Sequence, residues 1–249
     1  MTNASERGGT IWSFGGGAQS AAIAALIYSG VLPIPGIAVI ADTGREGSET
    51  WKYLDECIQP RMTEIGLHVH RIPHSYATVD LWSGADGDTV LMPMFSSRGG
   101  MVSKFCSQEW KTRPVARFLR ERAITTGDMW IGFSTDEMQR CRVPSPPFPH
   151  VYPLIQRRMN RGDCIALVER MGWPTPPRSS CWMCPYKTHS EWSSLPNEDF
   201  LKAVALEREV QLKDSDLWLH KSCKPLETVN FDSEPDMFND ECTSGMCFT

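Results

Sequence analysis

The sequence predicts an α/β fold: a three-layer sandwich around a mostly parallel central sheet of about five strands. Two observations lead to this prediction. Short apolar runs that end in glycines or polar turns alternate with longer helical segments over residues 10–133. At the amino end, an apolar run, a glycine loop, an Ala/Ile/Leu-rich segment and a second apolar run form a complete βαβ unit.

The individual elements follow in chain order. Apolar or alternating runs predict strands at residues 10–14, 36–41, 67–72 and 128–133. Residues 73–103 lack a clear period and predict a long connection. Gly30, Gly66 and Gly172 mark helix ends. The expected helices are 19–28, 48–65, 107–123, 161–171 and 197–213.

The character of the sequence changes after residue 142, where four prolines crowd residues 144–149. This change predicts a core of residues 1–142 and a smaller subdomain of residues 143–249 that packs on it and contains several cysteines.

Composition excludes several classes of protein. The 249 residues contain 25 Lys and Arg against 30 Asp and Glu, a net charge of −5, which argues against a uniformly basic nucleic-acid-coating protein. No apolar stretch reaches the ~18 residues of a membrane span, and the first residues lack the apolar region of a signal peptide. We therefore expect a cytoplasmic protein. In that compartment, an odd count of 9 cysteines favours metal ligation or redox chemistry over a disulfide framework.

A glycine-rich loop follows the first expected strand, with the sequence Ser13-Phe14-Gly15-Gly16-Gly17-Ala18-Gln19-Ser20. Glycines let the backbone approach a phosphate closely, and the start of the next helix offers unpaired N–H groups. The loop is not a Walker A motif, which ends in Gly-Lys-Ser/Thr, nor a Rossmann fingerprint, which needs glycine at position 20. A phosphate site is the favoured interpretation, and a plain turn is the alternative.

The loop resembles the PP-loop, Ser-Gly-Gly-x-Asp-Ser, of the ATP pyrophosphatases or adenine nucleotide alpha hydrolases. Gly15 replaces the first Ser and Gln19 the Asp. Three later segments resemble the PAPS reductase branch of that superfamily, and the resemblance covers residues 10–195. These segments are Asp42-Thr43-Gly44, the stretch Cys106 to Pro114, and Gly132 with Glu137 and Arg140.

The resemblance implies a site for ATP or a PAPS-like adenine nucleotide, with Mg²⁺, in the core of residues 1–142. Lys111 and Arg113 would face phosphate or sulfate groups. The implied nucleotide-binding residues are Ser13, Gly15, Gly16, Gly17, Gln19, Ser20, Asp42, Thr43, Gly44, Lys111, Arg113, Gly132, Glu137 and Arg140.

Cys181 and Cys184 form a C-x-x-C turn, which suits a shared metal, a cluster or a redox pair. Together with Cys106 they resemble assimilatory APS reductases, in which a Cys-Cys pair and a later Cys-x-x-Cys bind a [4Fe-4S] cluster. Ser107 replaces the second cysteine here. The resemblance therefore implies three cluster ligands, with Cys242 as the candidate fourth.

Several alternatives remain for these cysteines. The fourth cluster position is open, holds a non-cysteine ligand, or is filled by Cys223 or Cys247 instead of Cys242. Structural zinc would join Cys181 and Cys184 to Cys242 and Cys247, or to His220 and Cys223. Free thiols are the third interpretation.

The tail resembles the C-terminal Glu-Cys-Gly of PAPS reductases at Glu241-Cys242. The resemblance implies that Cys242 is a nucleophile, and Lys111 is the second predicted catalytic residue.

Three functions fit these features. The favoured one is an enzyme that adenylates an acceptor oxygen with ATP and then delivers sulfur through a cluster or a cysteine. The acceptor would be nucleic acid, and a sulfur-donor or thiol-carrier protein would be a partner. The alternatives are a (P)APS reductase that forms sulfite, and a non-catalytic nucleotide- or cluster-binding subunit of a complex. A homodimer is compatible with each.

Overall fold

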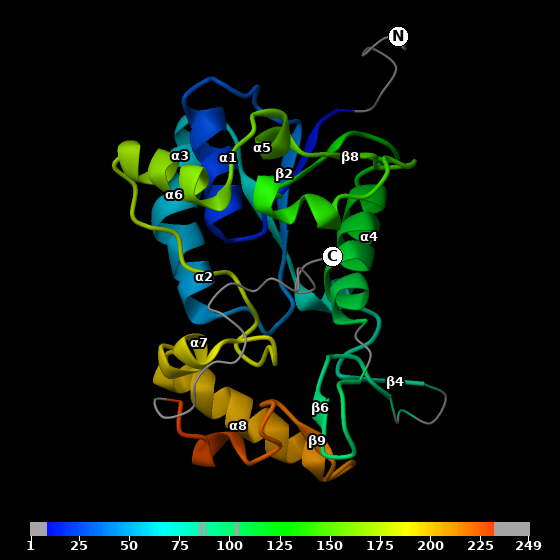
Figure 1. Cartoon of the computed structure of the whole chain (residues 1–249). Helices are drawn as coiled ribbons and strands as arrows, with labels where there is room; N and C mark the ends of the chain where they lie inside the picture. The colour runs from blue at the N-terminus through cyan, green and yellow to red at the C-terminus, as the bar shows by residue number, and fades with distance from the viewer. Residues whose placement is uncertain (1–8, 85–86, 88, 103–104, 232–249) are drawn as a thin grey trace. The chain divides into compact units, whose positions relative to one another are not determined.

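The computed structural model describes residues 9–84, 87, 89–102 and 105–231 (Figure 1). These residues form two compact units. Unit 1 comprises the described residues of 1–42, 49–76 and 113–179, and unit 2 those of 43–48, 77–112 and 180–249. Each unit is therefore assembled from three separate stretches of the chain.

Unit 1 is built on a five-stranded sheet in which all neighbouring strands run parallel. The strand order is β3-β2-β1-β7-β8. This sheet confirms the predicted α/β fold. The fifth strand, β8, lies in the proline-rich segment, where two residues are too few to show a period. The strands are β1 (Ile11–Ser13), β2 (Ile37–Ala41), β3 (Val69–Ile72), β7 (Met129–Ile131) and β8 (His150–Val151).

Helices cover the sheet of unit 1 on both faces. Figure 1 shows α1, α3 and α6 on one side and α4 on the other. The expected helix 48–65 is divided by a π-helical segment, Leu54–Ile58, and Pro60 lies in the first turn of α3. The helices are α1 (Ala18–Tyr28), α2 (Ser48–Tyr53), α3 (Gln59–Glu64), α4 (Arg113–Glu121), α5 (Pro153–Gln156) and α6 (Arg161–Arg170).

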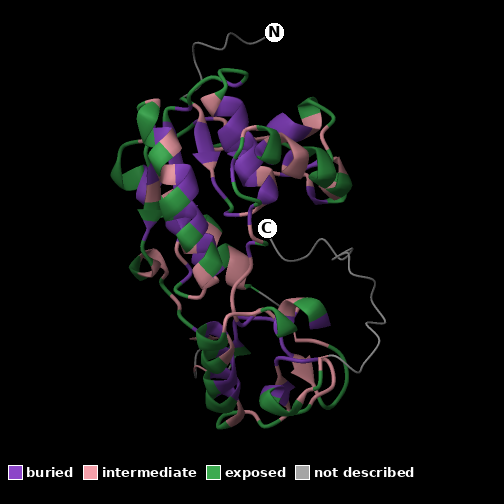
Figure 2. Ribbon diagram, turned by 90° about the vertical axis from the view of Figure 1, so that its left-hand side faces the viewer, coloured by how far each residue is buried: buried purple, intermediate pink, exposed green. Residues whose placement is uncertain are grey.

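Helix α1 is buried on nearly every side, as its purple colour shows in Figure 2. Its Ala, Ile and Leu side chains pack between the sheet and helices α3 and α6. The helix ends at Ser29 and Gly30, and the positive φ of Gly30, +74°, turns the chain away from the helix axis. A helix buried in this way cannot tilt freely, so its first turn is held rigidly at the edge of the sheet.

The strand order places two loops together. The chain runs from β1 outward to β2 and β3, and then returns to place β7 on the other side of β1. The carboxyl ends of β1 and β7 therefore meet where the strand order reverses, the position at which open α/β sheets bind ligands. A Cβ on Gly132, just after β7, would lie 3.2 Å from Ser20 Oγ.

Unit 2 has its own apolar core, in which Met92, Met94, Trp192 and Leu219 are almost fully buried. The long connection predicted for residues 73–103 contains three of its short strands. Across the described residues of the chain, no helix is both long and apolar enough to cross a membrane. The elements of unit 2 are β4 (Trp82–Ser83), β5 (Thr89–Val90), β6 (Phe95–Ser96), α7 (His189–Ser193), α8 (Asn197–Gln211) and β9 (Leu217–Trp218), with a π-helical segment, Gln108–Thr112.

Candidate phosphate site and cysteine site

The loop between β1 and α1, residues 14–20, is here named the phosphate loop. Ser20 Oγ accepts a hydrogen bond of 2.8 Å from the backbone N–H of Gly15. The Ser179 hydroxyl donates to the carbonyl of Gly15. Gly16 has φ +80°, and a Cβ at this position would lie 2.5 Å from Thr50 Cγ2. A hydrogen bond to Ser20 thus closes the loop, and the loop packs against Thr50 and Ser179.

The phosphate loop presents a row of unused backbone donors. Helix α1 has Gly17 as its N-cap, and no side chain caps it. Among the described residues, no atom accepts a hydrogen bond from the backbone N–H groups of residues 16–20. Buried amides are rarely left without an acceptor, and a helix N-terminus also carries positive partial charge. This arrangement suits an anion.

Gln19 connects the phosphate loop to the segment after β7. Its Nε2 donates to Glu137 Oε2 at 3.0 Å, and its Oε1 accepts from Arg161 at 3.3 Å. Glu137 is also paired with Arg140, whose guanidinium carbon lies 4.3 Å from the ring centroid of Phe133. The neutral amide of Gln19 therefore satisfies a carboxylate on one side and a guanidinium on the other. A carboxylate at position 19 would face Glu137 directly.

Six of the predicted nucleotide-binding residues are brought together around this loop: Gly15, Gly16, Gly17, Gln19, Ser20 and Glu137. Gly132 packs against Ser20, and Arg140 is buried beside Glu137. Ser13 ends β1, Asp42 follows β2 and Arg113 begins α4, so these three also belong to unit 1. Nucleotide contacts by any of these residues stay predictions.

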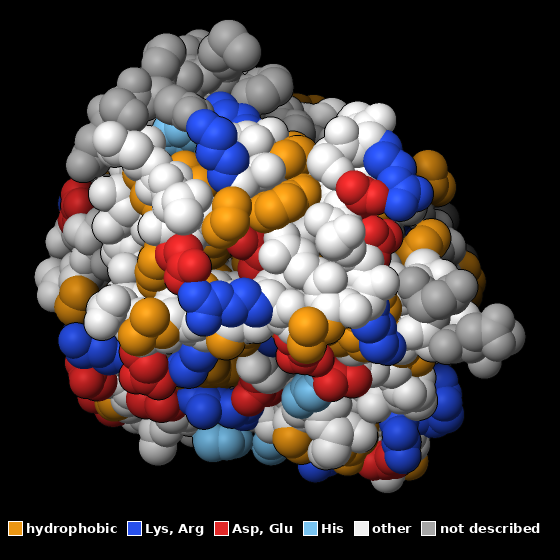
Figure 3. All heavy atoms as spheres, turned by 90° about the horizontal axis from the view of Figure 1, so that it is seen from below, with side chains coloured by type: hydrophobic (Ala, Val, Ile, Leu, Met, Phe, Trp, Pro, Cys, Tyr) orange, Lys and Arg blue, Asp and Glu red, His pale blue; other side chains and the backbone are white. Residues whose placement is uncertain are grey.

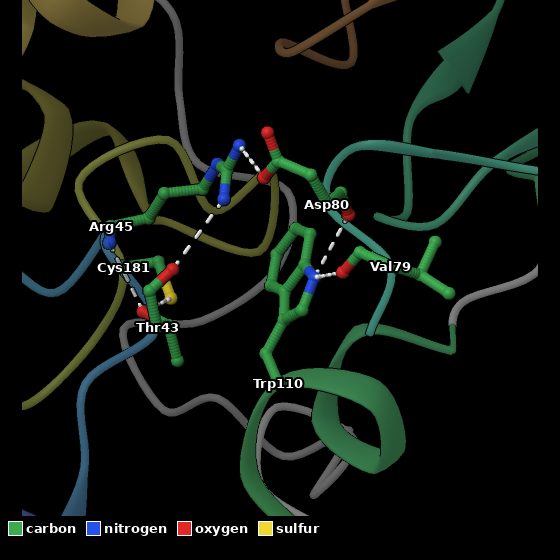
Figure 4. A network of polar contacts seen from close by, with 6 residues as sticks. All are labelled: Thr43, Arg45, Val79, Asp80, Trp110 and Cys181. Atoms are coloured by element: carbon green, nitrogen blue, oxygen red, sulfur yellow. Dashed lines mark hydrogen bonds and ion pairs between the residues drawn. The ribbon is translucent and has the colours of Figure 1, made fainter. Parts of the chain in front are cut away.

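Thr43, Gly44 and Lys111 instead belong to unit 2, where they lie with the cysteines. Figure 4 shows part of this region, here named the cysteine site and defined by Thr43, Glu46, Cys106, Lys111, Cys181 and Cys184. Thr43 Oγ1 lies 3.7 Å from Cys181 Sγ. Cys181 also pairs with Glu46 in an isolated antiparallel bridge, which fixes the backbone beside the thiol.

Arg45 lies beside Thr43 and Cys181 of the cysteine site (Figure 4). Its guanidinium pairs with Asp80 at 2.7 Å and its carbon lies 4.7 Å from the ring centroid of Trp110. The Trp110 indole N–H donates to the carbonyls of Val79 and Asp80, at 3.1 and 2.9 Å. The side chain of Arg45 is only 12% exposed, so a cation is held in place next to Thr43.

Lys111 forms an ion pair with a buried carboxylate. Its Nζ lies 2.6 Å from Glu46 Oε1, and the two side chains are 27% and 3% exposed. Burial by itself would lower the pKa of Lys111, but the charges of Glu46, Cys181 and Cys106 outweigh it, and the net direction is upward. Glu46 Oε2 is buried and has no hydrogen-bond partner in the described residues. Lys111 is therefore the principal charge partner of Glu46.

The three cysteines implied as cluster ligands all lie in unit 2. Lys111 interacts electrostatically with Cys106 and Cys181, and Cys181 with Cys184. Within the part of the chain that the structure describes, however, no three His, Cys, Asp or Glu side chains are placed to hold a metal ion. The described residues do not fit a metal or a cluster as they stand. Cys242 and Cys247 lie outside the described residues, so a fourth ligand and the nucleophilic role of Cys242 stay predictions.

The zinc alternative that uses His220 and Cys223 is not favoured by the contacts of His220. Its Nδ1 lies 2.8 Å from Ser222 Oγ, and its Nε2 lies 3.1 Å from His189 Nε2. Both ring nitrogens are thus engaged within the protein. The Cys223 thiol points to the carbonyl of Lys221 at 3.9 Å. His220 and Cys223 therefore make hydrogen bonds within the protein in place of the bonds to zinc that this alternative requires.

The cysteine site predicts a steep pH dependence for alkylation of Cys181. Burial, followed by the Glu46 charge, raises the pKa of this thiol to about 12. Because only the thiolate reacts, labelling by iodoacetamide should be slow at pH 8 and rise about tenfold per pH unit up to pH 10. Mass spectrometry of the Cys181 peptide from metal-free protein measures the rate. The urea-unfolded chain is the control, and Glu46→Gln should speed labelling because it removes a negative charge. A folded-state rate equal to the unfolded one would contradict this site.

Three residues of these two sites have no role predicted from the sequence: Arg45, Glu46 and Ser179. Glu46 follows the Asp42-Thr43-Gly44 turn, and Ser179 stands two positions before Cys181, so their places in the sequence are signals that could have found them. No local pattern brings Arg161 to Gln19, because 142 positions separate the two.

The surface drawn in Figure 3 shows Lys and Arg side chains intermixed with Asp and Glu. This face is not uniformly basic, in keeping with the net charge of −5.

No protein-family model matches the chain. No curated protein matches it either. Among solved structures, the chain is similar to a phosphoadenylyl-sulfate (PAPS) reductase from Candida auris in a phosphate complex, with 14% identity and a TM-score of 0.43, over 67% of this chain and 74% of that chain. It is also similar to the U34-tRNA thiolase NcsA from Methanococcus maripaludis, solved with its [4Fe-4S] cluster, with 13% identity and a TM-score of 0.44, over 89% of this chain and 72% of that chain.

Proposed function

We propose that this protein is an enzyme that binds ATP, or a related adenine nucleotide, at the phosphate loop and uses it in sulfur transfer. The observation that carries the proposal is the row of backbone N–H groups of residues 16–20, for which the described chain offers no acceptor. A polyphosphate supplies several anionic oxygens to such a row. The uncapped start of the buried helix α1 adds favourable charge.

In the proposed reaction, an acceptor carbonyl oxygen attacks the α-phosphorus of ATP, and the bond to pyrophosphate breaks. Adenylation turns a poor leaving group into AMP. A sulfur nucleophile then forms a bond to the carbonyl carbon that carries the adenylated oxygen. The bond between this carbon and the oxygen breaks, and AMP leaves. The acceptor class we favour is a base in nucleic acid. The sulfur source is sulfide, or a cysteine persulfide; with a persulfide, a second thiol then breaks the S–S bond, which releases the thiolated base and leaves a disulfide for a thiol carrier to reduce.

The cysteine site supports the sulfur part of this proposal. Cys181 lies beside a hydroxyl, Thr43, and an ammonium, Lys111. Lys111 and Thr43 favour the anionic forms of this sulfur, a thiolate or a persulfide, whereas burial and the Glu46 charge outweigh them in the free thiol and keep its pKa high. The described residues require no metal for this role.

Product analysis tests the function. Anaerobically purified protein is first assayed for iron, sulfide and zinc, and then incubated with ATP, a sulfur donor and either tRNA or DNA. The proposal expects pyrophosphate, AMP and thiolated nucleosides in equal amounts, and none of these products from Cys181→Ser. Sulfite formed from PAPS with thioredoxin, and no thiolated product, would establish the (P)APS reductase instead. ATP binding with no turnover on any acceptor would establish a non-catalytic subunit.

A further inference from the structure

Arg161 brings a cation to the phosphate loop from a distant part of the sequence. It is the first residue of α6, and one N–H of its guanidinium donates to Gln19 Oε1 at 3.3 Å. Arg161 is exposed, and its other guanidinium N–H groups have no partner in the described residues. A guanidinium has five donors, so one bond leaves most of them available to a ligand.

The backbone of Arg161 is held firmly in place. Its N–H donates to Asp136 Oδ2 at 2.6 Å. The residue before it, Asn160, caps α6 in a reciprocal capping box with Asp163. Helix α6 in turn packs along α1, the helix that the phosphate loop begins. The position of Arg161 beside Gln19 therefore follows from two anchored helices within unit 1.

The charges around the loop favour a polyanion. Two carboxylates lie here: Glu137, which contacts Gln19 and is neutralised by Arg140, and Asp136, which accepts the backbone N–H of Arg161. Gln19 is neutral. Within this network, Arg161 adds a positive charge that faces solvent, next to the positive end of α1. Guanidinium groups bind phosphate through two parallel hydrogen bonds, which makes Arg161 suited to a phosphate beyond those that the amides hold.

We propose that Arg161 contacts the terminal phosphates of the bound nucleotide and that Gln19 positions it, so that the site selects a triphosphate or diphosphate tail over a monophosphate. This inference rests on the proposed function, since it concerns the ligand of the same loop. Arg161 and Gln19 would distinguish nucleotides by the number of their phosphates, whereas the backbone N–H groups of residues 16–20 alone would bind any phosphate.

Calorimetric titration with ATP, ADP and AMP tests this assignment. A charge-assisted hydrogen bond is worth enough that Arg161→Met should weaken ATP binding about tenfold or more, while AMP binding changes less than about twofold. Arg161→Lys keeps the charge but loses the planar guanidinium that binds phosphate through two hydrogen bonds, so its ATP affinity should fall between those of the wild type and Arg161→Met. Arg170→Met removes an exposed arginine at the other end of α6, about 13 Å along the axis, and should leave all affinities unchanged.

Gln19→Leu tests the positioning role, because it removes the amide hydrogen bonds to Ser134, Glu137 and Arg161 at nearly constant volume. It should reduce the ratio of ATP to AMP affinity in the same direction as Arg161→Met, by a smaller factor. Thermal unfolding of each variant confirms that the fold is intact. If wild-type protein binds ATP and Arg161→Met leaves the ATP-to-AMP ratio unchanged, this inference is wrong and the proposed function stands. If wild-type protein binds no adenine nucleotide, the proposed function itself fails.

Discussion

Gly16→Ala should weaken ATP binding by about two orders of magnitude or more. The added Cβ would lie 2.5 Å from Thr50 Cγ2 and 3.1 Å from Ser179 Oγ, and φ +80° is a conformation that alanine adopts only with strain. The loop must shift to relieve the contacts, and its amides then lose their common direction. We expect ATP affinity to fall about 100-fold or more, as expected when two or more charge-assisted hydrogen bonds are lost. Isothermal calorimetry measures the affinity.

A matched control separates steric contact from backbone strain. Gly30 has a similar φ, +74°, and a Cβ there would meet no atom within 4 Å. Gly30→Ala should therefore cost about 1 kcal/mol of stability through its positive φ alone, and leave ATP affinity unchanged. Equal ATP affinities for Gly16→Ala and Gly30→Ala would show that the phosphate loop does not bind ATP.

Lys111→Met should strongly destabilise unit 2. It leaves the Glu46 carboxylate buried, 3% exposed, without the one charge partner that it has among the described residues. Removing one member of a buried ion pair costs about 3–5 kcal/mol, and we expect the lower end because Lys111 is itself 27% exposed. Urea unfolding followed by tryptophan fluorescence measures the loss, since Trp110 and Trp192 lie in the same core.

Two further variants make this prediction specific. Lys111→Met combined with Glu46→Gln removes both charges and should recover most of the stability. Arg208→Met breaks an ion pair with Glu227 in which both side chains are well exposed, 66% and 45%, and should cost less than about 1 kcal/mol. A Lys111→Met variant as stable as Arg208→Met would show that Glu46 is not a buried charge.

The sequence predicts much of unit 1 because its signals are local. The glycine loop, the apolar helix after it and the apolar runs on either side lie within residues 10–41 and specify one βαβ unit without help from the rest of the chain. The expected helices at 19–28, 161–171 and 197–213 agree with α1, α6 and α8 to within two residues. Their periodicity and glycine stops are properties of the segment itself.

The contacts that define the two sites depend on pairs far apart in the chain. Gln19 and Glu137 are 118 positions apart, and Thr43 and Cys181 are 138. The composition of a local segment cannot predict contacts between residues so far apart in the sequence. The motif resemblance gives Gln19 and Lys111 roles toward a nucleotide, whereas the structure shows that their nearest charged partners are Glu137, Arg161 and Glu46. These partners explain why an amide at position 19 suits its surroundings.

The most direct test of the phosphate loop is nuclear magnetic resonance of protein labelled with ¹⁵N-glycine. On addition of ATP, the amide resonances of Gly16 and Gly17 should shift strongly, because their N–H groups gain acceptors, while Gly30 and Gly172 stay in place. Adenosine, which lacks phosphates, should leave the loop resonances unmoved. Saturating ATP that shifts neither Gly16 nor Gly17 would contradict the central claim that this loop binds the phosphates of an adenine nucleotide.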